Sequence, residues 1–230
     1  MSLPVEKTKI ETSISKQIFL VYGRPKIGKS TFCNQFPNPL FLATEPGLNH
    51  LECYKMIINT WEKFLDACAD IAKGGHQYKT IVIDTFDNLI DLCADWVCRE
   101  KSIEHVSELP MGKGYGFVNT QIRQKITKLA NLGYAVILVS HCELIEVETK
   151  TRKFNKYTIS VSGKNRGFAL GLPDYILFID SIVKDNEEVR IVRTKPSMFW
   201  DAGDRSNKLP AEMALNYNEL AKYFKQEEVK

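Results

Sequence analysis

The sequence predicts an α/β fold in which helices cover a mostly parallel sheet. Apolar residues fill positions 18–22 and 135–139, and they dominate 40–44, which ends in Thr44, and the β-branched run 80–84, which ends in Asp84. Strands buried on both faces of a parallel sheet have this uniformly apolar character. Helical spacing of apolar residues appears between the later runs, at 61–73, 87–99 and 117–132, as in βαβ units. A glycine-containing turn directly after the first run is the third observation that favours this class.

That turn has the composition of a phosphate-binding loop, or P-loop. Its residues are Gly23, Arg24, Pro25, Lys26, Ile27, Gly28, Lys29 and Ser30, and a helical pattern begins at Thr31. In such a loop, backbone N–H groups and the N-terminus of the following helix surround the phosphates of ATP. We predict that residues 23–31 bind ATP, with Lys29 on the β- and γ-phosphates and the Ser30 hydroxyl on Mg²⁺. The alternative is an ordinary glycine-containing loop with a surface lysine.

Two polar residues stand at the ends of predicted strands. Asp84 ends the run 80–84, where a carboxylate in a P-loop protein holds Mg²⁺. His141 follows the run 135–139, where it can contact the γ-phosphate or an attacking water. The alternatives are a simple turn-forming aspartate and a histidine that hydrogen-bonds the backbone.

Composition excludes some classes of protein. The net charge of +3 is too small to indicate nucleic-acid binding by itself. No apolar run approaches the length of about 18 residues that spans a bilayer, and the first residues lack a signal-peptide pattern. We therefore expect a cytoplasmic protein with no membrane partner.

The six cysteines are scattered and form no C-x-x-C pair. We interpret them as free thiols in a reducing compartment. A zinc site at Cys93, Cys98 and His105 is an alternative, but cysteines that fill a helix face are the favoured explanation.

Residues 144–148 and 157–161 alternate between apolar and polar side chains, which predicts a β-hairpin. Its tip is basic, and Phe154 and Tyr157 lie among the cations. Cations that follow a phosphate backbone and aromatic rings that stack on bases form a surface for single-stranded DNA. The residues that we predict to contact DNA are Lys150, Arg152, Lys153 and Lys156. A solvated charged hairpin is the alternative.

The remaining segments suggest one domain, residues 17–230, after an N-terminal arm, residues 1–16. Residues 101–116 interrupt the helical pattern and predict a long loop that is either functional or a disordered connector. Two more strands are predicted at 175–183 and 189–194, and a closing helix at 217–224. Arg193 and Lys195 alternate with Thr194, so both should project from one face of the chain.

With these positions in place, the chain resembles a RecA-type ATPase core, and specifically the short phage ATP-binding proteins of the Sak-type single-strand annealing group. The likeness runs from about residue 18 to residue 224. It rests on the P-loop, Leu42-Ala43-Thr44-Glu45, Ile81-Val82-Ile83-Asp84-Thr85, Gly112-Lys113-Gly114-Tyr115-Gly116, Ser140-His141, Arg193-Thr194-Lys195-Pro196 and Ala202-Gly203-Asp204-Arg205. The resemblance implies a three-layer RecA-like P-loop NTPase fold, with a mostly parallel central sheet extended by C-terminal antiparallel strands.

The resemblance also implies roles for residues. Glu45 would polarise the attacking water as general base, and His141 would stand where the family usually has a glutamine sensor. The strand that leads to His141 would lie between the P-loop strand and the strand that ends at Asp84. Arg193 and Lys195 would reach the γ-phosphate of a neighbouring subunit, so hydrolysis would need a homo-oligomer.

The leading hypothesis is a Mg²⁺-dependent ATPase that binds single-stranded DNA and acts in phage recombination or annealing. An ATP-driven switch or loader that acts on a replication protein, without direct DNA contact, is the main alternative. A phage or host single-strand binding or replication protein is a candidate partner. A small-molecule kinase is less favoured because its arginine-rich lid and extra P-loop glycine are missing, and a protein that only binds ATP is also an open interpretation.

Overall fold

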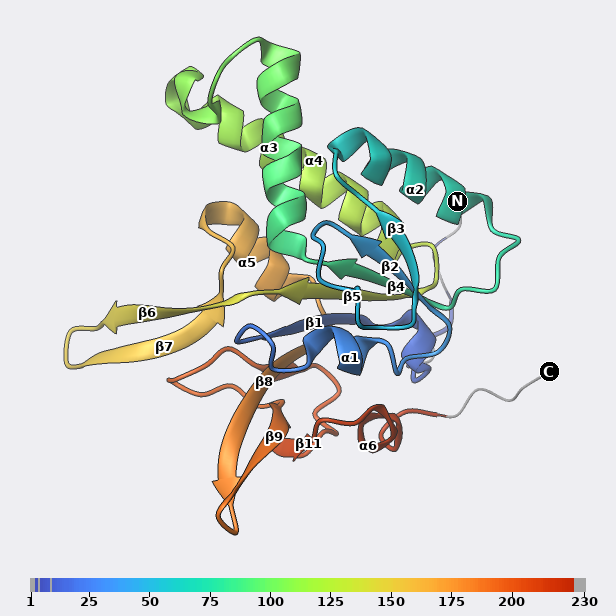
Figure 1. Ribbon diagram of the computed structural model, residues 1–230, viewed down its shortest axis with the longest axis vertical. Helices are drawn as coiled ribbons and strands as arrows, with labels where there is room; N and C mark the ends of the chain where they lie inside the picture. The colour runs from blue at the N-terminus through green and yellow to red at the C-terminus, as the bar shows by residue number, and fades with distance from the viewer. Residues whose placement is uncertain (1–2, 4, 9, 226–230) are drawn as a thin grey trace.

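The computed structural model describes residue 3, residues 5–8 and residues 10–225. Its main sheet contains β1 (Ile18–Gly23), β2 (Pro39–Ala43), β3 (Tyr54–Ile57), β4 (Thr80–Asp84), β5 (Ala135–Ser140), β8 (Tyr175–Lys184), β9 (Glu187–Arg193), β10 (Gly203–Asp204) and β11 (Glu212–Ala214). In the described part of the chain, the order is β11-β9-β8-β1-β5-β4-β2-β3, with β10 beside β8 (Figure 1).

The centre of this sheet is parallel and one side of it is antiparallel. Strand β1 pairs in parallel with β5 and β8, and β4 pairs in parallel with β5 and β2. Strands β9, β10 and β11 join antiparallel. The predicted fold class is therefore confirmed. Strand β5, which leads to His141, lies between the P-loop strand and the strand of Asp84, as the resemblance implied.

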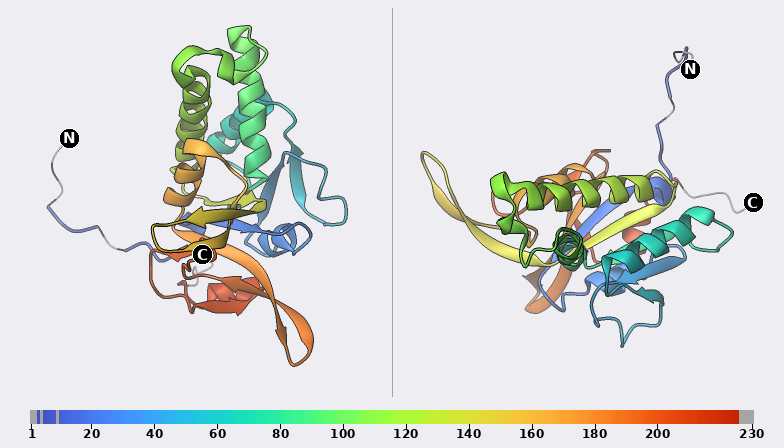
Figure 2. Two further views of the ribbon diagram at one scale, coloured as in Figure 1. Left: turned by 90° about the vertical axis from the view of Figure 1, so that its left-hand side faces the viewer. Right: turned by 90° about the horizontal axis from the view of Figure 1, so that it is seen from above.

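Helices cover both faces of the sheet and make three layers (Figure 2). Helices α2 (Trp61–Lys73), α3 (Phe86–Lys101), α4 (Lys113–Ala130) and α5 (Gly163–Gly171) pack with Leu20 and Tyr22 of β1. Helix α1 (Lys29–Cys33) and helix α6 (Tyr217–Ala221) pack with Phe19 and Val21 on the other face. Alternate residues of one apolar strand thus enter two separate cores, because successive side chains point to opposite faces.

A two-stranded hairpin, β6 (Cys142–Glu148) and β7 (Lys153–Ile159), continues from β5 and projects away from the sheet (Figure 1). Tyr157 near its base stacks on Phe178, which stacks on Tyr22, with ring centroids 5.6 and 4.9 Å apart. The predicted hairpin is confirmed with different bounds. Lys153 and Lys156 lie within β7 and not in the tip, which contains residues 149–152.

Sequence reasoning placed α2 and β4 correctly but was wrong about residues 101–116. That stretch contains two short 3₁₀ helices, η2 (Val106–Glu108) and η3 (Pro110–Gly112), and the first turn of α4. The glycines of this stretch are typical of loops, and the prediction of a loop rests on them. A Cβ atom on Gly114 would lie 2.1 Å from the carbonyl oxygen of Val106, so this glycine allows close packing of helix against backbone.

Several shorter elements differ from expectation. Strands β3, β10 and β11 and helix α5 were not predicted, and α6 ends at Ala221, earlier than the predicted residue 224. In the arm, residues 14–16 form a 3₁₀ turn, η1 (Ile14–Lys16), and Ser13 bridges to Lys225. Residues 1, 2, 4 and 9 lie outside the described residues, and the division at residue 16 stays a prediction.

All six cysteines are free, as expected. Within the described ranges, no group of His, Cys, Asp and Glu has the geometry of a metal site, and the zinc alternative gains no support. None of the helices in those ranges is long and apolar enough to cross a bilayer.

The contact at Gly114 gives a stability test. We expect Gly114→Ala to lower the free energy of unfolding by about 1–3 kcal/mol, because the added methyl group overlaps the Val106 backbone. Gly116 lies in the same helical turn with open space around its Cβ position, so Gly116→Ala should raise it by about 0.5–1 kcal/mol. Urea unfolding followed by circular dichroism measures both, and equal effects of the two substitutions would contradict the packing argument.

Candidate functional site

The P-loop connects β1 to α1 at the carboxyl end of the sheet. Gly28 has φ +105°, a left-handed conformation that strongly favours glycine, and it directly precedes α1. Gly23 has a different role, because a Cβ there would lie 2.6 Å from the Ile179 carbonyl oxygen of β8. The first glycine therefore permits close strand packing, and the second permits the turn that exposes the N-terminus of α1.

Lys29 is anchored inside the loop. Its Nζ donates to the carbonyl oxygens of Gly23 and Arg24 at 2.9 and 3.1 Å, and the residue is 8% exposed. Burial lowers the pKa of the Lys29 ammonium, while the nearby Asp84 carboxylate opposes that shift. The side chain thus lies beside acidic groups at the mouth of the loop.

Ser30 and Asp84 meet between α1 and β4. The Ser30 hydroxyl donates to Asp84 Oδ2 at 2.6 Å, and Asp84 is 4% exposed. Burial raises the pKa of the Asp84 carboxyl, the Ser30 hydrogen bond lowers it and Glu45 raises it. A hydroxyl oxygen and a carboxylate oxygen side by side are ligands that suit Mg²⁺, so the predicted pair fits that ion by its chemistry.

Two hydrogen bonds connect the residue after β2 to the residue after β4. Thr44 Oγ1 donates to the carbonyl oxygen of Thr85 at 3.0 Å and accepts from the Thr85 amide at 2.8 Å. The peptide bond between Asp84 and Thr85 is cis. These contacts fix the start of the loop that carries Glu45 next to Asp84.

Glu45 lies between two side chains from neighbouring elements. The side-chain amide of Asn88 donates from Nδ2 to Glu45 Oε2 at 3.1 Å, and His141 Nε2 is 3.8 Å from Glu45 Oε1. Glu45 is partly exposed, with a third of its side-chain surface accessible. Its carboxylate is therefore oriented from the protein side while it remains open to a ligand or water.

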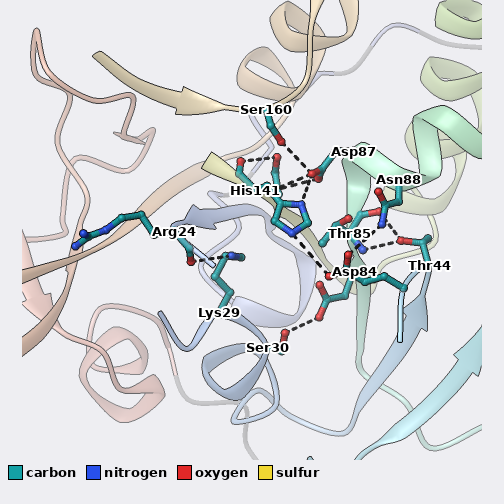
Figure 3. A network of polar contacts seen from close by, with 12 residues as sticks. Arg24, Lys29, Ser30, Thr44, Asp84, Thr85, Asp87, Asn88, His141 and Ser160 are labelled. Atoms are coloured by element: carbon teal, nitrogen blue, oxygen red, sulfur yellow. Dashed lines mark hydrogen bonds and ion pairs between the residues drawn. The ribbon is translucent and has the colours of Figure 1, made fainter. Parts of the chain in front are cut away.

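His141 is oriented in turn by Asp87, in the first turn of α3 (Figure 3). His141 Nδ1 lies 2.5 Å from Asp87 Oδ2, and the His141 amide donates to the same carboxylate at 3.3 and 3.4 Å. The Ser160 hydroxyl adds a third donor at 2.9 Å. Because a carboxylate accepts, the ring donates from Nδ1 and turns Nε2 toward Glu45.

One cavity of about 430 Å³ contains these groups. Its lining includes Lys29, Ser30, Glu45, Asp84 and His141. The structure thus brings together every predicted catalytic and metal residue except Arg193 and Lys195. Of the predicted loop residues, Pro25, Lys26, Gly28 and Thr31 also line the cavity.

Some residues of the site were missed by sequence reasoning. Asp87, Asn88 and Ser160 orient Glu45 and His141, and Arg190 of β9 lines the cavity beside Gly28. Asp87 lies three residues after Asp84, in the first turn of a helix that starts at the carboxyl edge of the sheet, and this spacing was a usable signal. Ser160 and Arg190 carry no comparable signal.

Arg193 and Lys195 are held by contacts within the chain. Arg193 pairs with Asp180 at 2.9 Å and with Glu212 at 3.2 Å, and its guanidinium lies 4.3 Å from the Trp200 ring centroid. Lys195 pairs with Asp204 at 3.3 Å. Neither residue lines the 430 Å³ cavity, and their role toward a neighbouring subunit stays a prediction.

The four predicted DNA-contacting residues divide into two pairs. Lys153 pairs with Glu146 at 2.7 Å and Lys156 with Asp201 at 2.6 Å. Lys150 and Arg152 are exposed at the tip, and their side chains form no ion pair with any residue in the described ranges. The hairpin therefore presents its unpaired positive charge at the tip.

A second cavity, of about 570 Å³, lies at the base of the hairpin. Asp87 and Ser160 line it together with Tyr115 of α4 and with Lys164 and Asn165 of α5. Asn165 is 6% exposed, and its Oδ1 finds no hydrogen-bond partner among the described residues. The Asp87 carboxylate thus borders both this cavity and, through His141, the first.

The orientation of His141 can be tested directly by NMR. In the neutral ring, we expect His141 to carry its proton on Nδ1, because Asp87 accepts there. Asp87→Ala should shift the proton to Nε2. Long-range ¹H–¹⁵N spectra, assigned with His141→Gln, distinguish the two tautomers. An Nε2–H form in the wild-type protein would contradict the assigned geometry.

Comparisons with known proteins agree with this picture. A family model described as AAA domain matches residues 15–206. The chain is similar to the SPbeta prophage-derived uncharacterized protein YorG of Bacillus subtilis strain 168, with 25% identity over 138 aligned residues, and the match covers 57% of this chain and 43% of that protein. The match therefore spans less than half of that relative's length.

Two solved structures show weaker likeness. A KaiC-like protein of Pyrococcus horikoshii OT3 is 16% identical, with a TM-score of 0.45 and coverage of 78% of each chain. The flagellar accessory protein FlaH of Methanocaldococcus jannaschii is 9% identical, with a TM-score of 0.41 and coverage of 78% of this chain and 77% of that one. Because the family model matches most of the chain, including the P-loop, Asp84 and His141, the chain belongs to the AAA domain family of P-loop proteins.

Proposed function

We propose that the protein is a Mg²⁺-dependent ATPase whose turnover responds to single-stranded DNA. The observation that carries the ATPase part is the position of Glu45. It lies in the same cavity as Lys29, Ser30 and Asp84, where the Asn88 side-chain amide donates to its carboxylate and His141 Nε2 lies 3.8 Å away. A protein that only binds ATP needs the P-loop but has no need for an oriented carboxylate at this place.

Each residue has a task that its contacts support. Exposed amides at the start of α1 and the Lys29 ammonium bind the phosphates. Ser30 and Asp84 would hold Mg²⁺, which neutralises phosphate charge when it is bound. Glu45 accepts the proton of the attacking water, and the hydrogen bond from Asn88 limits the directions that its carboxylate can take.

The DNA part of the proposal rests on the connection between the hairpin and the site. The hairpin leaves the sheet at His141 and returns at Ser160, and both residues bond to Asp87. A ligand that moves the hairpin therefore acts on the carboxylate that orients His141. The 570 Å³ cavity at the hairpin base is large enough for a nucleobase, with Tyr115 available for stacking and Lys164 for a phosphate.

The biological setting that we propose is phage DNA recombination or annealing. The relative in Bacillus subtilis is described as prophage-derived, which supports a phage setting. A homo-oligomer in which Arg193 and Lys195 complete a neighbouring site would require both residues to leave their present partners, Asp180 and Asp204. A phage or host single-strand binding or replication protein remains a candidate partner.

Two substitutions test the ATPase assignment. Lys29→Ala should weaken ATP binding by about 10–100-fold, because a charged hydrogen-bond donor to phosphate is lost. Glu45→Gln should leave ATP binding intact and slow hydrolysis by about 10²–10⁴-fold, because the general base is removed. Isothermal titration and phosphate release measure the two effects. Glu52→Gln on the exposed surface of the same loop is the control, and full turnover by Glu45→Gln would remove the assignment.

A second test concerns the hairpin. Replacing Lys150 and Arg152 with serine should reduce the salt slope for binding of labelled oligo(dT) by about 1.4, since each lost phosphate contact contributes about 0.7. Replacing Lys153 and Lys156 should change the slope less, because both already have carboxylate partners. Binding is followed by fluorescence anisotropy at several salt concentrations. An ATPase rate that oligo(dT) does not change would instead favour a switch or loader.

A further inference from the structure

A groove between α2 and α4 lies on the outer side of the helical layer, apart from both cavities described above. Its volume is about 400 Å³. The α2 side is formed by Leu65, Cys68, Ala69 and Ala72, and the α4 side includes Lys125 and Leu129. No residue of the proposed ATPase or DNA surfaces lines it.

Helix α2 has more apolar surface than its packing on the sheet uses. Trp61, Phe64, Ala67 and Ile71 are buried and form the stripe that enters the core. The groove residues 65, 68, 69 and 72 form a second stripe with the spacing i, i+3, i+4 and i+7. Ala69 and Ala72 are exposed and Leu65 and Cys68 are partly buried, so this second face has no complete cover within the chain.

The rim of the groove on the α4 side is positively charged. Lys125 and Lys128 are one helical turn apart and both line the groove. Neither ammonium forms an ion pair with a residue in the described part of the chain. Of the three carboxylates of α2, Glu62 pairs with Arg99 and Asp70 with Lys73, and Asp66 does not line the groove. Leu132, at the end of the groove, is 40% exposed.

We propose that this groove binds a short acidic amphipathic segment of a partner protein. Apolar side chains of that segment lie between α2 and α4, and its carboxylates face Lys125 and Lys128. The shape favours a single segment over a folded surface, because a stable contact between two folded proteins usually buries about 800 Å² on each partner. A helix or extended peptide laid into a groove needs only a few apolar anchors, with charges at the rim that select the partner.

The test begins with an unbiased probe. A random 12-residue peptide library displayed on phage is selected against the full chain, and the most enriched peptide is synthesised with a fluorescent label. We expect enriched sequences that combine several Asp or Glu residues with at least two large apolar residues. The double variant Lys125→Glu, Lys128→Glu should weaken binding of that peptide at least tenfold in anisotropy titrations. Ala69→Trp should do the same by filling the groove.

A charge-matched control separates the groove from net charge. Lys184 and Lys208 are exposed and lie outside the groove, so Lys184→Glu, Lys208→Glu should change the affinity less than twofold. Thermal unfolding checks that each variant is folded. If Ala69→Trp proves unstable, the double lysine variant still tests the proposal, because it replaces only side chains at the groove rim.

Three results would overturn the proposal. One is a selection that enriches no peptide, or only peptides without acidic residues. Another is a peptide whose affinity the groove variants leave unchanged. The third is a change in the sedimentation of the protein alone on Ala69→Trp or on the double lysine substitution, because that result would assign the groove to a second copy of the chain.

Discussion

The Asp87 carboxylate is the contact on which the candidate site depends. It accepts from the ring and the amide of His141 and from the hydroxyl of Ser160, and only 14% of its side-chain surface is exposed. Hydrogen bonds to a charged group contribute about 1.5–3 kcal/mol each, and removal of the acceptor would leave several donors partly buried without a partner. The geometry of His141, and through it the surroundings of Glu45, therefore follows from one side chain in the first turn of α3.

The sheet explains why these residues meet. The P-loop, His141, Asp84 and Glu45 follow β1, β5, β4 and β2, which are consecutive neighbours in the sheet. Parallel strands end at the same edge, and polar groups that would be costly inside the apolar core collect there. One apolar core on each face of the sheet holds the strands in place, and the polar residues of the candidate site lie at the carboxyl edge. In this fold, the burial that stabilises the protein and the polar cluster of the candidate site occupy different parts of the same strands.

Much of this could be predicted because apolar strands and strand-end carboxylates have local signatures. The P-loop, Asp84 and the bounds of α2 and β4 follow from continuous apolar runs and glycine spacing. The packing role of Gly114 could not be predicted, because the sequence does not show that the Val106 carbonyl group approaches this glycine. Ser160 and Arg190 were missed because their positions depend on how the hairpin returns and on how β9 is aligned with β8. Strand β3, only four residues long and mostly exposed, has too little apolar pattern to be recognised.

The position of Asp87 also limits how strongly the hairpin can influence the proposed hydrolysis. Asp87 borders the cavity at the hairpin base, and His141 separates it from the cavity of the P-loop. A hairpin ligand that withdraws Ser160 removes one charged hydrogen bond and leaves those of His141 in place. One that also shifts the His141 backbone disturbs the ring itself. Coupling through one such bond corresponds to about 1.5–3 kcal/mol, or about 10–150-fold between the two binding equilibria. A larger effect of DNA would need a second element to move, and the ion pairs that hold Arg193 and Lys195 are the ones that a neighbouring subunit could exchange.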